Sequence, residues 1–209
     1  VEGAAEDVVE APVESRYELV QTVAALEAWV ARATEAGWVA VDTETTSLNS
    51  MRAELVGVSL SIDPGHACYI PLAHKQALEQ GTLDLGGEGS GDGDEALEQI
   101  PVDQALAILK PMLEDPATLK IGQNIKYDMQ IFAKVGVFIA PVDDTMVLSY
   151  VLEGGMHGHG MDELAQLHLD RTTVKFKEVV GSGKSQITFD YVPLEKALDY
   201  AAEDADITL

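Results

Sequence analysis

Apolar and polar positions follow two different periods along the chain, so both strands and helices are expected. Mostly apolar runs between turn residues predict strands at 17–20, 37–44, 54–62, 66–73 and 118–124. Apolar residues at helical spacing predict helices at 22–35, 102–115, 125–136, 142–153, 161–169 and 192–209. Most of the predicted strands lie in the first part of the chain, and helices then alternate with a strand in the rest. This order predicts an α/β or α+β fold with a mixed sheet surrounded by helices.

Two acidic segments interrupt this pattern. Residues 1–15 contain Pro12 and are rich in acid, Ala and Val, which predicts a linker or tail. Residues 79–98 are rich in Gly and acid, which predicts a flexible surface loop. The remaining segment, 16–209, is expected to form one domain. Its last helical pattern still continues at residue 209, so we expect the chain to be a piece of a longer protein.

The chain is long enough, at 209 residues, to bury a full core. Its single cysteine, Cys68, cannot form an internal disulfide, which favours a reducing, cytoplasmic setting. No apolar run approaches the roughly 20 residues of a membrane span, and the first residues do not resemble a signal peptide. No His or Cys spacing around Cys68, His66, His74 or His168 matches a zinc site.

The formal net charge of −23 argues against DNA binding by a basic surface. The two acidic segments carry twelve of the negative charges and no base. Six lysines in the middle and late chain either line a groove or belong to an ordinary solvated surface: Lys120, Lys126, Lys134, Lys175, Lys177 and Lys184.

The strand at 37–44 ends with Asp42 and Glu44, two residues apart. Alternate residues of a strand point to the same face, so both carboxylates emerge together. Two anions at the end of a buried strand repel each other unless a divalent cation lies between them, and carboxylate oxygens suit Mg²⁺ or Mn²⁺. The alternative is that Asp42 caps the turn and Glu44 is exposed.

Two further groups of polar residues are candidates for the same site. In "GQNIKYD" (122–128), Asp128 falls in the first turn of a helix, where the helix dipole alone would also favour a carboxylate. In "YAAEDAD" (200–206), Tyr200 and Asp204 are four residues apart and share one helical face. An exposed acidic helix is the alternative for this second group.

Together, "DTET", "GQNIKYD" and "YAAEDAD" resemble the proofreading 3′–5′ exonuclease superfamily, which has four acids in this order and a helical Tyr. The flanking segments "LVGVSL", "YIPLAH", "LKPMLED", "DDTMVLSYVLE" and "FKEVVGSGKSQITF" narrow the resemblance to the exonuclease domain of bacterial family A DNA polymerases, the DNA polymerase I type. The resemblance covers residues 16–209. It implies a ribonuclease H-like α/β fold.

The resemblance also implies roles for individual residues. Asp42, Glu44 and Asp204 would hold one divalent metal ion, and Asp42 with Asp128, through water, a second. These ions would be Mg²⁺ or Mn²⁺, with Zn²⁺ an option at one position. Tyr200 would orient the attacking water. The residues that would hold a frayed 3′ end are Thr45, Leu48, Gln123, Asn124, Tyr127 and Phe176.

The implied function is removal of nucleoside 5′-monophosphates from single-stranded or frayed DNA 3′ ends, as proofreading for a polymerase domain in the same chain. The protein would be monomeric and act in the bacterial cytoplasm at the nucleoid. One alternative is an RNA-trimming exonuclease of the ribonuclease D kind. Another is a catalytically silent scaffold that holds DNA.

One position departs from the resemblance, and one motif suggests a different function. Related domains carry an Arg, expected to contact a phosphate near the cut, where this chain has Gly158. That contact is missing unless His157, His159 or a nearby lysine supplies it. The "GSGKS" at 181–185 suggests a nucleotide-binding P-loop, but the pattern is incomplete and is not clearly placed between a strand and a helix, so a glycine-rich surface loop is the preferred interpretation.

Overall fold

The computed structural model describes residues 15–76 and 97–209. The predicted acidic tail and the predicted glycine-rich loop fall almost entirely outside these ranges. None of the helices in the described ranges combines the length and the apolar character that a membrane span needs.

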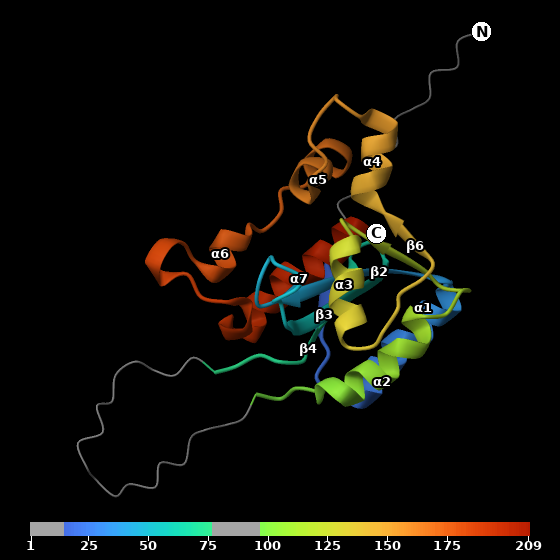
Figure 1. The fold of residues 1–209 in the computed structure, drawn as a ribbon, viewed down its shortest axis with the longest axis vertical. Helices are drawn as coiled ribbons and strands as arrows, with labels where there is room; N and C mark the ends of the chain where they lie inside the picture. Colours follow the sequence, from blue (N-terminus) through green and yellow to red (C-terminus); the bar gives the residue numbers. More distant parts are fainter. Residues whose placement is uncertain (1–14, 77–96) are drawn as a thin grey trace, which may run out of the picture.

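Six strands form one mixed sheet at the centre of the molecule (Figure 1). In spatial order they are β1 (Arg16–Leu19), β4 (His66–Pro71), β3 (Leu55–Asp63), β2 (Trp38–Thr45), β5 (Leu119–Gly122) and β6 (Val142–Asp144). β2, β3 and β4 pair antiparallel, as the short turn at 63–65 predicted, while β1, β5 and β6 pair parallel with their neighbours. The predicted mixed sheet with flanking helices is therefore confirmed.

Helices cover both faces of this sheet (Figure 1). They are α1 (Val23–Ala36), α2 (Val102–Leu113), α3 (Lys126–Lys134), α4 (Thr145–Glu153), α5 (Met161–Leu169), α6 (Phe176–Val180) and α7 (Leu194–Thr208), with the short 3₁₀ helices η1 (Gly183–Ser185) and η2 (Phe189–Tyr191). The larger hydrophobic core joins α1, α2 and α3 to one face. A smaller core joins α6, η2 and α7 to the other. Strand residues alternate between the two cores: Cys68 and Ile70 pack in the larger, and Tyr69 packs in the smaller.

Local signals set the ends of α1, the helix that precedes the acidic strand. The Thr22 hydroxyl accepts a hydrogen bond from the Ala25 amide at 3.3 Å, which caps the first turn. Gly37 ends the helix with φ of 81°, in the left-handed region that favours glycine. Strand β2 therefore starts at Trp38 and ends at Thr45, one residue later at each end than the predicted strand at 37–44.

The predicted helix at 142–153 is wrong in its first turn. Residues Val142–Asp144 form β6, which pairs with β5, and the helix begins only at Thr145. The Asp144 carboxylate accepts hydrogen bonds from the amides of Met146 and Val147, and this N-cap excludes Asp144 itself from the helix. The 3₁₀ helices and α6 were not predicted, because segments of three to five residues carry too little periodicity.

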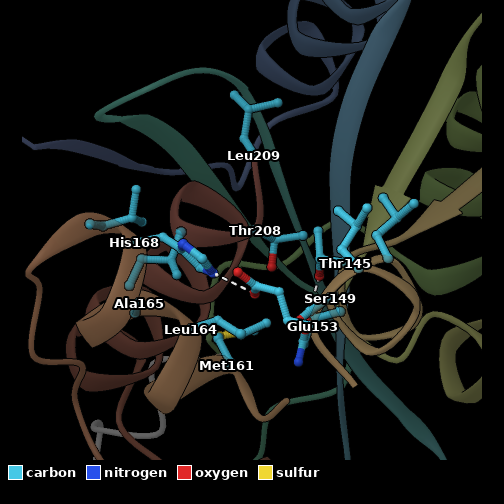
Figure 2. Close-up of a pocket in the computed structure, with 14 residues that line it drawn as sticks. Thr145, Ser149, Glu153, Met161, Leu164, Ala165, His168, Thr208 and Leu209 are labelled. Atoms are coloured by element: carbon cyan, nitrogen blue, oxygen red, sulfur yellow. Dashed lines mark hydrogen bonds and ion pairs between the residues drawn. The ribbon is translucent and has the colours of Figure 1, made fainter. Parts of the chain in front are cut away.

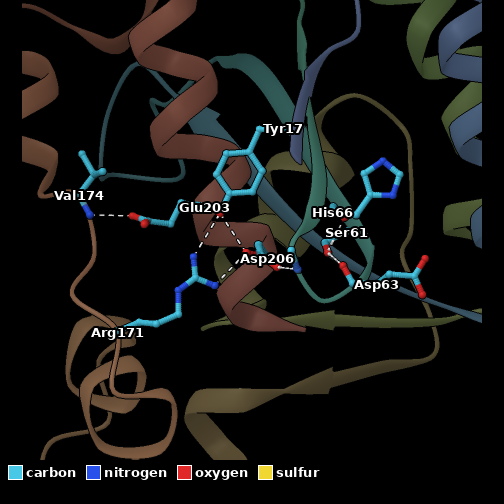
Figure 3. A network of polar contacts seen from close by, with 9 residues as sticks. Tyr17, Ser61, Asp63, His66, Arg171, Val174, Glu203 and Asp206 are labelled. Carbon is cyan, nitrogen blue, oxygen red and sulfur yellow. Dashed lines mark hydrogen bonds and ion pairs between the residues drawn. The ribbon is translucent and has the colours of Figure 1, made fainter. Parts of the chain in front are cut away.

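A buried ionic network ties the last turn of α7 to the sheet (Figure 3). The Asp206 carboxylate, with its side chain 1% exposed, accepts hydrogen bonds from Arg171 Nη1 and Tyr17 Oη, both at 2.9 Å, and from the Gly65 amide at 2.5 Å. Val174 donates its amide proton to Glu203 of the same helix at 2.6 Å. These contacts fix α7 against β1 and the β3–β4 turn, and thereby set the position of the helix face that carries Tyr200.

Removing the arginine of this network should destabilise the fold. Arg171→Met leaves the buried Asp206 carboxylate with only two neutral donors, and we expect a loss of about 2 kcal/mol of unfolding free energy. Urea denaturation checks this value. Lys110→Met is the matched control, because it breaks the solvent-exposed pair with Glu114 and should cost less than about 1 kcal/mol. Equal losses in the two variants would contradict the structural role of Arg171.

Candidate metal-dependent active site

Strand β2 divides its side chains between the two faces of the sheet. Val39 and Val41 pack in the core beneath α1 and α2. Asp42 and Glu44 leave from the opposite face, where they meet Asp204 of α7. One carboxylate oxygen of each of these three residues lies within 4.8 Å of the others. The shared face predicted from the i, i+2 spacing is therefore present, and the alternative of an exposed Glu44 is wrong because Glu44 is only 6% exposed.

Burial raises the pKa of all four acids, and repulsion within the cluster raises it further for Asp42 and Glu44. The pKa of Asp42 lies well above its usual range because of burial first and then because of Asp128, Glu44 and Asp204. The pKa of Glu44 is raised as well, by burial first and then by the charges of Asp204 and Asp128. Burial raises the pKa of Asp128 and of Asp204 to about 7 each. The cluster therefore resists full ionisation unless a positive charge enters it.

Asp128 lies in the first turn of α3, as predicted, and is 2% exposed. The Thr43 hydroxyl donates a hydrogen bond to its carboxylate at 2.5 Å, and this contact works against the effect of burial on its pKa. Thr45, two residues further along β2, bonds the Tyr127 hydroxyl at 2.6 Å. The two threonines thus connect β2 to α3. The sequence analysis missed Thr43, whose only signal is its place between the two acids.

Tyr200 and Asp204 occupy one face of α7, as their spacing predicted. The Tyr200 hydroxyl donates a hydrogen bond to the Asp204 carboxylate, and burial raises the pKa of Tyr200. The Tyr200 ring packs against Phe176 and Phe189, with centroids 5.9 and 6.0 Å away. Phe176 and Phe189 lie nearly parallel at 6.4 Å. Phe189, which sequence reasoning also missed, therefore supports both aromatic members of the predicted site.

A single cavity of about 860 Å³ gathers the predicted site. Its lining includes all eleven predicted residues: Asp42, Glu44, Thr45, Leu48, Gln123, Asn124, Tyr127, Asp128, Phe176, Tyr200 and Asp204. Leu48 stands 89% exposed at the rim, where an apolar side chain can reach a ligand. Asn124 has φ of 59° and does not cap α3, whose N-cap is Ile125, so the capping interpretation of Asn124 is wrong.

None of the six candidate lysines is among the residues that line this cavity. Lys120 is fully buried and donates to the carbonyls of Asp115, Thr118 and Ala140 at 2.9, 2.6 and 2.6 Å. Its ammonium group satisfies backbone acceptors, so it cannot belong to a groove. The charged side chains that line the cavity are carboxylates, and none of the candidate lysines contributes to it.

His157 and His159, the candidates to replace the arginine missing at Gly158, are not among the residues that line the cavity. The His159 carbonyl does accept a hydrogen bond from Gln123 Nε2 at 2.8 Å. The "GSGKS" segment forms η1 after α6 and has no strand before it. It therefore lacks the strand–loop–helix arrangement of a P-loop.

The residues of the acidic cluster fit a divalent cation. Glu44 Oε1 is buried and has no hydrogen-bond partner among the residues that the structure describes, which is costly for a carboxylate oxygen. A cation among Asp42, Glu44 and Asp204 would satisfy this oxygen and offset the repulsion. Carboxylates without histidine or cysteine are the donor set that Mg²⁺ and Mn²⁺ prefer.

Solved structures share this fold. The match with Escherichia coli RNase D covers 92% of this chain and 42% of that protein, with a TM-score of 0.62 and 18% identity. The match with NrnC of Brucella melitensis, solved with bound Mg²⁺, covers 93% of this chain and 75% of that protein, with a TM-score of 0.57 and 21% identity. Similarity at this level shows the fold, and it is the ribonuclease H-like fold that the sequence predicted.

Sequence comparisons narrow the family. The family model described as 3′–5′ exonuclease, from the A-type DNA polymerases, matches residues 17–209. DNA polymerase I of Rhizobium leguminosarum is 46% identical over 93% of this chain, and DNA polymerase I of Pseudomonas aeruginosa is 40% identical over 99%. The chain spans about a fifth of the length of these relatives (19% and 21%). By sequence and by fold, this chain belongs to the 3′–5′ exonuclease family of the A-type DNA polymerases.

Proposed function

We propose that residues 16–209 form the 3′–5′ exonuclease domain of a longer polymerase chain, and that this domain removes nucleoside 5′-monophosphates from single-stranded or frayed DNA 3′ ends. The convergence of Asp42, Glu44 and Asp204, with oxygens within 4.8 Å of one another beside Tyr200, is the observation that carries this proposal. In the cell the domain would act in the cytoplasm, at the nucleoid.

Asp42, Glu44 and Asp204 would hold one divalent ion, and Asp42 with Asp128 the second. Two such ions supply charge stabilisation for in-line phosphodiester hydrolysis. They also account for phosphate binding by a chain with a net charge of −23, because bound cations reverse the local sign that a phosphate meets. No basic groove is then needed.

The remaining residues of the cavity would position water and substrate. Tyr200, whose hydroxyl bonds Asp204, would direct the attacking water toward phosphorus. Leu48 and Phe176 present apolar and aromatic surfaces against which unstacked bases can pack. Because those bases must leave the duplex first, a frayed end fits better than a paired one.

Single-turnover assays test the proposed function. A DNA strand labelled at its 3′ end should release nucleoside monophosphates with Mg²⁺ and none with EDTA. A mispaired primer end should be cut faster than a paired one, and equal rates would count against editing. An RNA strand of the same sequence should be cut more slowly. Preference for RNA would instead support the ribonuclease D alternative.

Cleavage of the labelled DNA strand in this assay would exclude the second alternative, a catalytically silent scaffold that holds DNA. If it is not cut, calorimetric titration with Mn²⁺ separates the remaining cases. Mn²⁺ binding without cleavage would mean that the site holds metal but lacks the proposed activity. Absence of binding would mean a scaffold that does not use its acids.

Tyr200→Phe should lower kcat about 10- to 100-fold, with little change in KM, because it removes the hydroxyl and keeps the ring that packs on Phe176 and Phe189. Steady-state kinetics on single-stranded DNA measure both constants. Tyr191→Phe is the matched control, since Tyr191 does not line the cavity, and should leave kcat unchanged. A rise in KM alone in Tyr200→Phe would place the residue in substrate binding instead.

A further inference from the structure

A second group of metal-ligating side chains lies where α4 meets α5, apart from the acidic cluster. Glu153 ends α4, His157 follows in the loop, and His168 stands in the last turn of α5. Glu153 Oε2 is 2.9 Å from His157 Nε2 and 3.5 Å from His168 Nε2. The three ligand atoms lie within 4.8 Å of one another. No zinc spacing was recognised in the sequence, because the three residues come from two helices and a loop.

Glu153 and His168 both line a separate pocket of about 340 Å³, where their side chains are close enough to form an ion pair (Figure 2). This pocket is otherwise lined mainly by apolar residues of α4, α5 and the end of α7. Glu153 and His157 are partly shielded, with side chains 32% and 15% exposed, while His168 is 49% exposed. The group is therefore accessible to an ion from solvent and yet sheltered on one side.

The His157 ring has an acceptor at each nitrogen. Its Nδ1 lies 2.6 Å from the Gly158 carbonyl, and its Nε2 lies 2.9 Å from the Glu153 carboxylate. A neutral imidazole has only one N–H, so one of these contacts would lack a proton. Either the ring is an imidazolium, or a cation lies beside Nε2. An Nδ1–H bond to a backbone carbonyl is the usual support of a histidine that binds metal through Nε2.

We propose that Glu153, His157 and His168 form a binding site for Zn²⁺ or a similar first-row transition ion, independent of the proposed exonuclease function. Two imidazoles and one carboxylate suit such an ion better than Mg²⁺, which prefers oxygen ligands alone. Tetrahedral Zn²⁺ with bonds of about 2.0–2.2 Å places its ligand atoms about 3.3–3.5 Å apart. The 3.5 Å separation matches this spacing, whereas the 2.9 Å separation is a hydrogen-bond distance that must lengthen by a few tenths of an ångström when the ion binds. Three protein ligands leave a fourth position for water.

The ion would cross-link α4, α5 and the loop between them. This loop also reaches the acidic cavity, because the His159 carbonyl accepts from Gln123, and His159 Nδ1 lies 2.8 Å from the Ser149 hydroxyl of α4. Metal binding should therefore stabilise the loop that supports Gln123. The site is structural, with no part in the hydrolysis itself.

Zinc titration of the intact chain tests this site once the acidic cluster has been disabled. In an Asp42→Ala/Asp204→Ala background, which removes two of the three clustered carboxylates, calorimetry should still show one equivalent of Zn²⁺. Adding His157→Asn or His168→Asn should weaken this binding by more than about 100-fold, beyond the loss expected for a residue that only supports a ligand. Adding His66→Asn, the same change at a distant histidine, should leave it intact.

Two further measurements keep the test independent of folding defects. Circular dichroism should be the same for all variants without metal, and Zn²⁺ should raise Tm only where all three ligands remain. Co²⁺ in place of zinc should give the absorption of a four-coordinate ion. Absence of zinc binding in the disabled background, or binding that survives both histidine substitutions, would overturn the site and identify His157 as an imidazolium paired with Glu153.

Discussion

Asp42→Ala should abolish metal-dependent cleavage of single-stranded DNA, lowering kcat/KM by about 1,000-fold or more. Asp42 is the one acid assigned to both metal ions, and its carboxylate lies within 4.8 Å of those of Glu44 and Asp204. Its loss removes several kcal/mol of charge stabilisation at the phosphate. Release of labelled nucleoside monophosphate in the presence of Mg²⁺ measures the effect.

The same variant should keep its fold. Asp42 is partly exposed and faces three like charges that raise its pKa, so the metal-free protein gains from losing it. Thermal unfolding in EDTA should give a Tm equal to or above that of the unmodified chain, while the rise in Tm caused by Mn²⁺ should be smaller. Asp63→Ala, which removes an exposed acid from the neighbouring strand, should retain full activity. Substantial nuclease activity in Asp42→Ala would reject the assignment of the site.

Residue spacing within a single strand or helix predicted which side chains of the site share a face of that element. Two-residue spacing on a strand predicted a common face for Asp42 and Glu44, and four-residue spacing on a helix did the same for Tyr200 and Asp204. The convergence of these two pairs with Asp128 could not follow from local pattern. Strand β2 and helix α7 lie about 160 residues apart in sequence, so only the family resemblance brought them together.

The errors of the sequence analysis have the same origin. No local pattern links Asp206 to the two residues that bond it, Arg171 and Tyr17, the latter 189 residues earlier. Lys120 was a candidate surface charge because nothing in the sequence shows the three carbonyls that enclose it. Strand β6 was missed because a three-residue edge strand depends on pairing with β5 rather than on its own composition.

Without metal, the stability of the protein should fall as pH rises from about 4 to about 7. Burial raises the pKa of Asp128 and Asp204 to about 7 in the folded state, whereas both return to ordinary values near 3.8 on unfolding. Over this interval the folded chain holds protons that the unfolded chain releases, so unfolding becomes easier with each added unit of pH. The stabilisation is complete below the unfolded pKa and is lost once pH passes the folded pKa.

The expected loss is on the order of 4 kcal/mol for either carboxyl taken alone. Urea denaturation in EDTA across this pH interval measures it. An Asp128→Asn/Asp204→Asn variant removes the two groups, because asparagine mimics the protonated carboxyl at every pH. The variant also lessens the upward pKa shifts of Asp42 and Glu44, to which both carboxylates contribute, so its curve should be flatter. Groups such as Asp162, Asp190 and His74 titrate in both proteins and cancel in the comparison. Excess Mg²⁺ should flatten the curve of the unmodified chain, since a bound cation favours the ionised carboxylates. If the two proteins show parallel curves in EDTA, the acids are not held in the buried, mutually repelling arrangement on which the metal site depends.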